Sequence, residues 1–142
     1  MKGMKSKLDK KTLKALAEEA LRMRAASYVP YSKFRVGATL LTTGGKIYTG
    51  CNIENAAYGP SNCAERTAFF KAVSEGERDF AAICIAGGPD GAEELDYCPP
   101  CGVCRQVMSE FCCGDFEIIL ARSPEDHKVF TLDQLLPERF DL

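Results

Sequence analysis

Apolar residues recur with a helical period near the start of the chain. From Asp9 onward they are separated by Lys and Glu, and the set comprises Leu13, Leu16, Ala17, Ala20, Leu21 and Tyr28. This spacing predicts an amphipathic helix that is capped by Asp9 and ends before Pro30. Two extended segments follow, over residues 35–41 and 46–50. Because Thr43-Gly44-Gly45 separates them, we expect a β-hairpin.

Helices and short strands alternate in the rest of the chain. After a loop over residues 51–62, we expect a helix from Cys63 to about Glu75, capped by Ser61 or Asn62 and closed by Gly76. The later elements are predicted as a strand over 80–86, a loop over 87–100, a helix from Cys101 to about Cys112 that Pro100 favours, a strand over 116–120, a short strand over 129–131 and a helical turn over 132–136.

This order of elements predicts an α/β fold with a central mixed sheet of about five strands covered by helices. One strand joins the second and third predicted helices. The right-handed crossover rule therefore places these helices side by side with their N-termini at the same edge of the sheet. Since Cys63 opens one helix and Cys101 opens the other, we expect the two cysteines to lie close together.

Composition limits the class of protein and its partners. The 142 residues suit a single domain over residues 1–142, and the net charge of −2 comes without a basic stripe for nucleic acid. No apolar stretch is long enough to cross a bilayer, and the basic N-terminus does not resemble a secretory signal. We therefore expect a cytoplasmic protein with reduced thiols, whose partner is a small molecule or another protein. With eight cysteines and only His127 as a histidine, a metal site must rely on sulfur.

Cys63, Cys101 and Cys104 are the candidate metal ligands. Cys101 and Cys104 are three residues apart at a helix start, so both sulfurs can point toward one ion. Helix N-termini stabilise the thiolate form, which is the form that binds zinc. Three protein ligands with one open position are typical of a catalytic zinc, whereas four closed ligands are typical of a structural one.

Glu65 and Arg66 lie directly after the first candidate ligand. Glu65 is two residues from Cys63, so it can approach the metal only because Cys63 stands at the helix end. A glutamate there can accept and return protons during hydrolysis. Three thiolates leave a zinc site with a net negative charge, and we expect Arg66 and the helix N-termini to offset it.

Other interpretations of the same cysteines remain open. Burial in the core is the expected role of Cys51, Cys84, Cys112 and Cys113. Cys98 extends the motif to C-x-x-C-x-x-C, and as a fourth ligand it would make the zinc structural and the protein a non-catalytic zinc-stabilised module. We expect Pro99 and Pro100 to turn Cys98 away. A redox dithiol at Cys101 and Cys104 would leave Glu65 without a role.

Several longer stretches resemble one family. Cys63-Ala64-Glu65 together with Pro100-Cys101-x-x-Cys104 is the cysteine form of the zinc deaminase signature. The additional matches are Tyr31-Ser32-Lys33-Phe34, Gly50 to Tyr58, Cys63 to Thr67, and Pro100 to Gln106. From about residue 17 to 140 the chain resembles the small homotetrameric cytidine deaminases of nucleoside salvage, which implies their three-layer α-β-α fold.

The resemblance implies hydrolytic deamination of cytidine and 2′-deoxycytidine, in which water activated by Zn²⁺ attacks C4 of the pyrimidine. Glu65 would protonate the ring nitrogen and then the departing ammonia. Asn52 and Glu54 would bind the ribose 3′-hydroxyl, while Phe34 and the amide of Ala64 would hold the base. Tyr58 is included in the substrate-binding set. Phe140 matches an aromatic residue that reaches into a neighbouring subunit's site.

Two related activities are alternatives to cytidine deamination. One is deamination of another aminopyrimidine nucleoside such as blasticidin S, and the stretch from Asn52 to Tyr58 favours cytidine over it. The other is deamination of a base within RNA or DNA, which the acidic balance and the short chain argue against.

Overall fold

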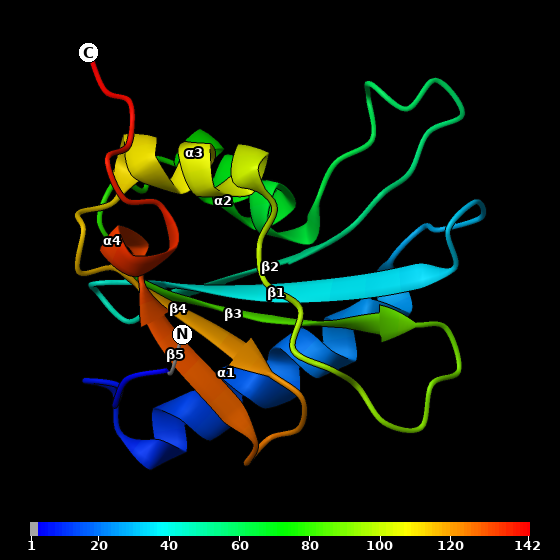
Figure 1. Ribbon diagram of the computed structural model, residues 1–142, viewed down its shortest axis with the longest axis horizontal. Coiled ribbons are helices and arrows are strands. Elements are labelled where there is room, and N and C mark those ends of the chain that lie inside the picture. The colour runs from blue at the N-terminus through cyan, green and yellow to red at the C-terminus, as the bar shows by residue number, and fades with distance from the viewer. Residues whose placement is uncertain (1–2) are drawn as a thin grey trace.

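The computed structural model describes residues 3–142, and these form a five-stranded mixed sheet with helices on both faces (Figure 1). The strand order is β2-β1-β3-β4-β5. The strands are β1 (Phe34–Thr42), β2 (Ile47–Cys51), β3 (Phe80–Pro89), β4 (Glu117–Ala121) and β5 (His127–Thr131). The predicted fold class and the predicted hairpin are therefore confirmed.

The helices divide between the two faces of the sheet (Figure 1). They are α1 (Lys10–Met23), α2 (Ala64–Ser74), α3 (Gly102–Phe111) and the single turn α4 (Leu132–Leu135), with a short 3₁₀ turn over Arg24–Ala26. The apolar stripe of α1 packs on one face in a cluster with β3, whereas α2 and α3 cover the opposite face. Because both faces are covered, the middle of β1 and most of β3 are buried almost without interruption.

Strand direction determines where the helices begin. β1 is antiparallel to both β2 and β3, so β2 and β3 run in the same direction and end at one edge of the sheet. The chain continues from β2 into α2 and from β3 into α3, so both helices start at that edge. β1 begins at the same edge. The predicted side-by-side placement of the two helix N-termini is confirmed.

Several boundaries differ from those predicted from sequence. The first helix ends at Met23, and Tyr28 lies beyond it with 57% of its surface exposed. Cys63 itself is the N-cap of α2, so the predicted cap at Ser61 or Asn62 is wrong. β3 continues to Pro89 because it pairs with the whole of β1. His127 is half-buried at the start of β5, which pairs with β4 along five residues and begins two residues before the predicted strand.

The expected burial of four cysteines is only partly correct. Cys51 and Cys84 are buried and Cys112 is half-buried, but Cys113 is exposed. The helix ends at Phe111, and Cys113 lies in the connection that follows. Within residues 3–142, no helix combines the length and apolar character needed to span a membrane.

Two glycines allow the helices to approach the sheet closely. A Cβ atom added to Gly37 in β1 would lie 2.0 Å from the carbonyl oxygen of Ala20 in α1. A Cβ atom added to Gly50 in β2 would lie 2.2 Å from the carbonyl oxygen of Ala64, the first residue of α2. Both clashes are with backbone, so they cannot be relieved by moving a side chain.

We therefore predict that Gly37→Ala and Gly50→Ala each lower the free energy of unfolding by about 3 kcal/mol, because a helix must move to admit the methyl group. Urea denaturation of each variant measures this change. Gly44→Ala in the β1–β2 turn is the control, since its nearest neighbour would lie 3.8 Å away. Wild-type stability in the two strand variants would contradict the account.

Candidate metal centre and substrate site

Three sulfur atoms meet where α2 and α3 begin. The Sγ atoms of Cys63 and Cys101 are 3.8 Å apart, and those of Cys101 and Cys104 are 3.5 Å apart. All three lie within 4.8 Å of one another. Cys63 and Cys101 are the N-caps of their helices, and Cys104 lies in the first turn of α3. The structure thus brings together the three cysteines that the sequence pattern selected.

The spacing of these sulfurs fits a zinc ion. Zinc binds thiolate sulfur at about 2.3 Å in tetrahedral geometry, which places neighbouring sulfurs about 3.8 Å apart. The donor set is also suitable, because soft thiolates favour zinc over hard cations such as magnesium. Neither N-cap cysteine uses its side chain to cap its helix, so both sulfurs remain available as ligands. Cys63, Cys101 and Cys104 can therefore hold zinc with a fourth position left open.

The surroundings stabilise a thiolate at Cys63. A hydrogen bond with Cys104 and one from Arg66 lower the pKa of Cys63 to about 5, against the opposing effect of burial. The Nη2 atom of Arg66 donates to the Cys63 sulfur at 3.1 Å. The pKa of Cys104 is raised, first because it shares its proton with Cys63 and then because it is buried. Arg66 thus places a cation in contact with the Cys63 sulfur, and the charge-balancing role expected from the sequence stays a prediction.

Glu65 lies in the first turn of α2 and is only 4% exposed. Burial raises the pKa of Glu65 to about 7, and the charge of Cys63 acts in the same direction. A carboxyl group with a pKa near 7 exchanges its proton readily at neutral pH. The placement beside the sulfurs depends on Cys63 being the N-cap, because the chain direction changes between the cap and the first helical turn.

Cys98 is not part of the sulfur group. Among the residues that the structure describes, the cluster that could hold a metal contains Cys63, Cys101 and Cys104 alone. Cys98 lies against Gly87 in β3, where an added Cβ would be 2.8 Å from its sulfur. Burial raises the pKa of Cys98 to about 11. The geometry therefore favours the open site over the closed structural one.

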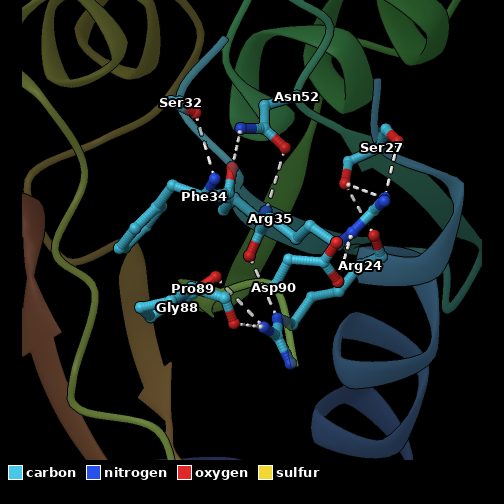
Figure 2. Close-up of polar contacts among 10 residues, drawn as sticks. Arg24, Ser27, Ser32, Phe34, Arg35, Asn52, Gly88, Pro89 and Asp90 are labelled. Atoms are coloured by element: carbon cyan, nitrogen blue, oxygen red, sulfur yellow. Dashed lines mark hydrogen bonds and ion pairs between the residues drawn. The ribbon is translucent and has the colours of Figure 1, made fainter. Parts of the chain in front are cut away.

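Asn52 and Glu54, the predicted ribose-binding residues, follow β2 at the same edge of the sheet. The Asn52 side chain accepts a hydrogen bond from the amide of Val36 at 2.9 Å and donates one to the carbonyl of Phe34 at 2.8 Å. Figure 2 shows this amide against the start of β1. The carboxylate of Glu54 accepts hydrogen bonds from the amides of Tyr31 and Ser32, both at 3.1 Å. Both side chains thus contact the segment that carries Phe34.

The remaining predicted site residues differ in exposure. Phe34 is the first residue of β1 and is 39% exposed. Ala64 is the first residue of α2, so its amide has no partner within the helix and is available to a ligand. Tyr58 and Phe140 are strongly exposed, at 77% and 68%. Tyr58 lies in the loop between β2 and α2, and Phe140 lies in the C-terminal tail.

A network of arginines that the sequence patterns did not reveal holds this edge of the sheet (Figure 2). Arg24 donates to the carbonyls of Arg35 at 3.0 Å and Gly88 at 3.1 Å, and so connects β1 with β3. Arg35 donates to the carbonyl of Ser27 at 2.8 Å and pairs with Asp90 at 3.0 Å. All these partners are far apart in sequence or are backbone atoms. No local pattern could have indicated the network.

Comparison with known proteins is consistent with this geometry. The zinc-binding region of cytidine and deoxycytidylate deaminases matches residues 10–120. A cytidine deaminase of Sporosarcina psychrophila is 50% identical over 125 residues, which cover 88% of each protein. One of Halalkalibacterium halodurans is 49% identical over 125 residues, which cover 88% of this chain and 91% of that protein.

Solved structures of cytidine deaminases also resemble the chain in fold. The crystal structure of cytidine deaminase from Burkholderia pseudomallei superposes with a TM-score of 0.79 and 46% identity, covering 89% of this chain and 97% of that one. Cytidine deaminase from Mycobacterium tuberculosis superposes with a TM-score of 0.74 and 35% identity, covering 95% and 99%.

We predict that Cys101→Ser lowers zinc affinity by at least about 100-fold, because loss of a ligand costs more than loss of a supporting contact. Competition with a chromophoric chelator measures the affinity. Cys113→Ser is the control, since Cys113 is an exposed thiol outside the cluster. Equal zinc affinity in the two variants would remove Cys101 from the ligand set.

Proposed function

The chain belongs to the cytidine and deoxycytidylate deaminase family, and we propose that it hydrolyses cytidine and 2′-deoxycytidine to uridine and 2′-deoxyuridine with release of ammonia. The observation that carries the proposal is the group of three sulfurs at two helix N-termini beside the buried Glu65. Of the alternatives considered from sequence, the redox dithiol leaves Glu65 unused, and the closed zinc module needs Cys98 in a group that excludes it.

Cys63, Cys101 and Cys104 would hold the zinc ion. When bound, zinc supplies Lewis-acid activation of water at neutral pH. Arg66 and the amides at the start of α2 and α3 oppose the negative charge that three thiolates bring to the site. The protein's part at this centre is therefore to keep the sulfurs ionised and to limit the charge that they impose on the reacting water.

Glu65 would move the protons of the reaction. Addition of water to C4 requires a base for the water proton and an acid for the ring nitrogen N3, and loss of ammonia requires a second proton at the amino nitrogen. One carboxyl group can do each in turn if its two protonation states are close in free energy. The pKa of about 7 that burial gives to Glu65 meets this requirement.

The edge of the sheet would bind the nucleoside. Asn52 and Glu54 present an amide and a carboxylate to the ribose 3′-hydroxyl, which both substrates possess. Phe34 offers an apolar ring to the pyrimidine, and the unpaired amide of Ala64 at the start of α2 offers a donor to it. Tyr58 belongs to the same set by its place in the matching motif.

A homotetramer would complete the pocket. Cys101 is exposed in the single chain, and Phe140 extends from the C-terminal tail with 68% of its surface free. An exposed metal ligand admits bulk water, whereas catalysis of this kind benefits from a desolvated site. Insertion of Phe140 from a neighbouring subunit would exclude that water and supply an apolar wall.

Pyrimidine salvage in the cytoplasm is the setting we propose for the protein, which would act as a single catalytic domain over residues 1–142. The eight cysteines are all free thiols, which suits a reducing compartment. The net charge of −2 suits a nucleoside better than a polynucleotide.

We predict that Glu65→Gln lowers the rate of cytidine deamination by about 10²–10⁴-fold while zinc content stays unchanged, because the amide keeps the shape of the side chain but cannot carry the proton. The change from the cytidine to the uridine ultraviolet spectrum measures the rate. Glu75→Gln, at the exposed far end of α2, is the control. No uridine from zinc-loaded wild-type protein would contradict the proposed function, and blasticidin S would then be the next substrate to test.

We also predict that Arg66→Gln retains zinc but loses about 10–100-fold in kcat, which is the worth of one hydrogen bond to a charged group. Metal analysis and steady-state kinetics on the same preparation separate the two effects. Arg78→Gln, on the exposed turn after α2, is a matched loss of charge away from the sulfurs. Unchanged turnover in Arg66→Gln would refute the charge-balancing role.

A further inference from the structure

The carboxylate of Glu54 is held by hydrogen bonds within the chain. It accepts hydrogen bonds from the amides of Tyr31 and Ser32 through Oε1, and a short one from the Ser32 hydroxyl through Oε2. These bonds join residues more than 20 positions apart in sequence. They fix the carboxylate against the turn that precedes β1.

The Ser32 hydroxyl also contacts Phe34. Its Oγ atom accepts a hydrogen bond from the Phe34 amide at 3.0 Å, as Figure 2 shows. A hydroxyl group has one proton to donate and lone pairs to accept with, so it can serve Glu54 and Phe34 at once. The same oxygen thus lies between the group proposed to bind ribose and the residue proposed to hold the base.

The turn from Ser32 to Phe34 has an unfavourable backbone conformation that hydrogen bonds must stabilise. Lys33, which separates Ser32 from Phe34, has a φ of 58°, a left-handed conformation that a non-glycine residue rarely adopts. Such conformations persist where surrounding contacts hold them. Here the Lys33 amide bonds to Val29 at 3.1 Å and its carbonyl accepts from Asp90 at 2.7 Å. The Phe34 carbonyl is held in turn by Asn52.

We propose that Ser32 is a positioning residue, whose hydroxyl couples the ribose-binding carboxylate of Glu54 to the base-binding ring of Phe34. The inference rests on the proposed function, because it takes Glu54 and Phe34 as substrate contacts. Through this coupling the sugar and the base are held in a fixed relation to one another. The hydrogen bond from Ser32 is also the largest cause that lowers the pKa of Glu54, so it favours the carboxylate form.

Steady-state kinetics of Ser32→Ala test the coupling. Since Glu54 and Phe34 contact substrate and not the sulfurs, we expect KM for cytidine to rise about tenfold while kcat stays within about threefold of wild type. Ser32→Thr retains the hydroxyl at an exposed position and should restore the wild-type KM. Ser74→Ala, which removes an exposed hydroxyl at the far end of α2, is the control.

A pair of substrates shows whether the loss passes through Glu54. 2′-Deoxycytidine has the 3′-hydroxyl that Glu54 would bind, and 2′,3′-dideoxycytidine lacks only that group. Ser32→Ala should therefore lose more in kcat/KM on 2′-deoxycytidine than on 2′,3′-dideoxycytidine. Equal losses on both substrates would show a general effect on folding and would overturn the proposal.

The outcomes distinguish a failure of the proposed function from a failure of the role of Ser32. Wild-type protein that makes no uridine contradicts the proposed function itself. Normal wild-type turnover, together with an unchanged KM in Ser32→Ala or a failure of Ser32→Thr to restore it, contradicts the role of Ser32 alone.

Discussion

The site depends on the meeting of two helix N-termini at one edge of the sheet. β2 and β3 run in the same direction because β1 is antiparallel to both, and each is followed by a helix on the same face. Sulfurs from the two N-cap positions and from the first turn of α3 consequently lie within 4.8 Å of one another. Neither helix alone could supply three ligands to one ion. The metal centre is therefore a product of topology, and its position follows from strand pairing far from the sulfurs.

The same edge of the sheet also offsets the charge of the thiolates and buries the carboxyl group of Glu65. Thiolates need cationic or dipolar partners, and here these are Arg66 and the amide groups at the helix ends. Glu65 lies beside the sulfurs but is 4% exposed, so burial raises its pKa to about 7. One location thus provides three sulfur ligands, with the thiolate favoured at Cys63, and a carboxyl group that can exchange a proton. Because β1 begins at this edge, Phe34 and the residues that hold it lie there too.

Local chemistry explains which features the sequence predicted well. The hairpin, the three main helices and the cysteine ligands follow from periodicity, turn residues and the C-x-x-C spacing, which act over a few residues. The cap of α2 was predicted wrongly because Ser61 and Asn62 are better cap residues than Cys63, yet tertiary packing places the cysteine there. Contacts such as those from Ser32 to Glu54 and from Arg24 to Gly88 join distant segments. These contacts form only in the assembled sheet, so no local sequence pattern predicts them.

X-ray absorption spectroscopy at the zinc edge of the purified protein tests the central claim most directly. The account predicts three sulfur neighbours at about 2.3 Å and one lighter oxygen or nitrogen neighbour. That result would establish a centre with an exchangeable position for water. Four sulfur neighbours would mean that Cys98 or another thiol closes the site, and would contradict a catalytic role for the metal.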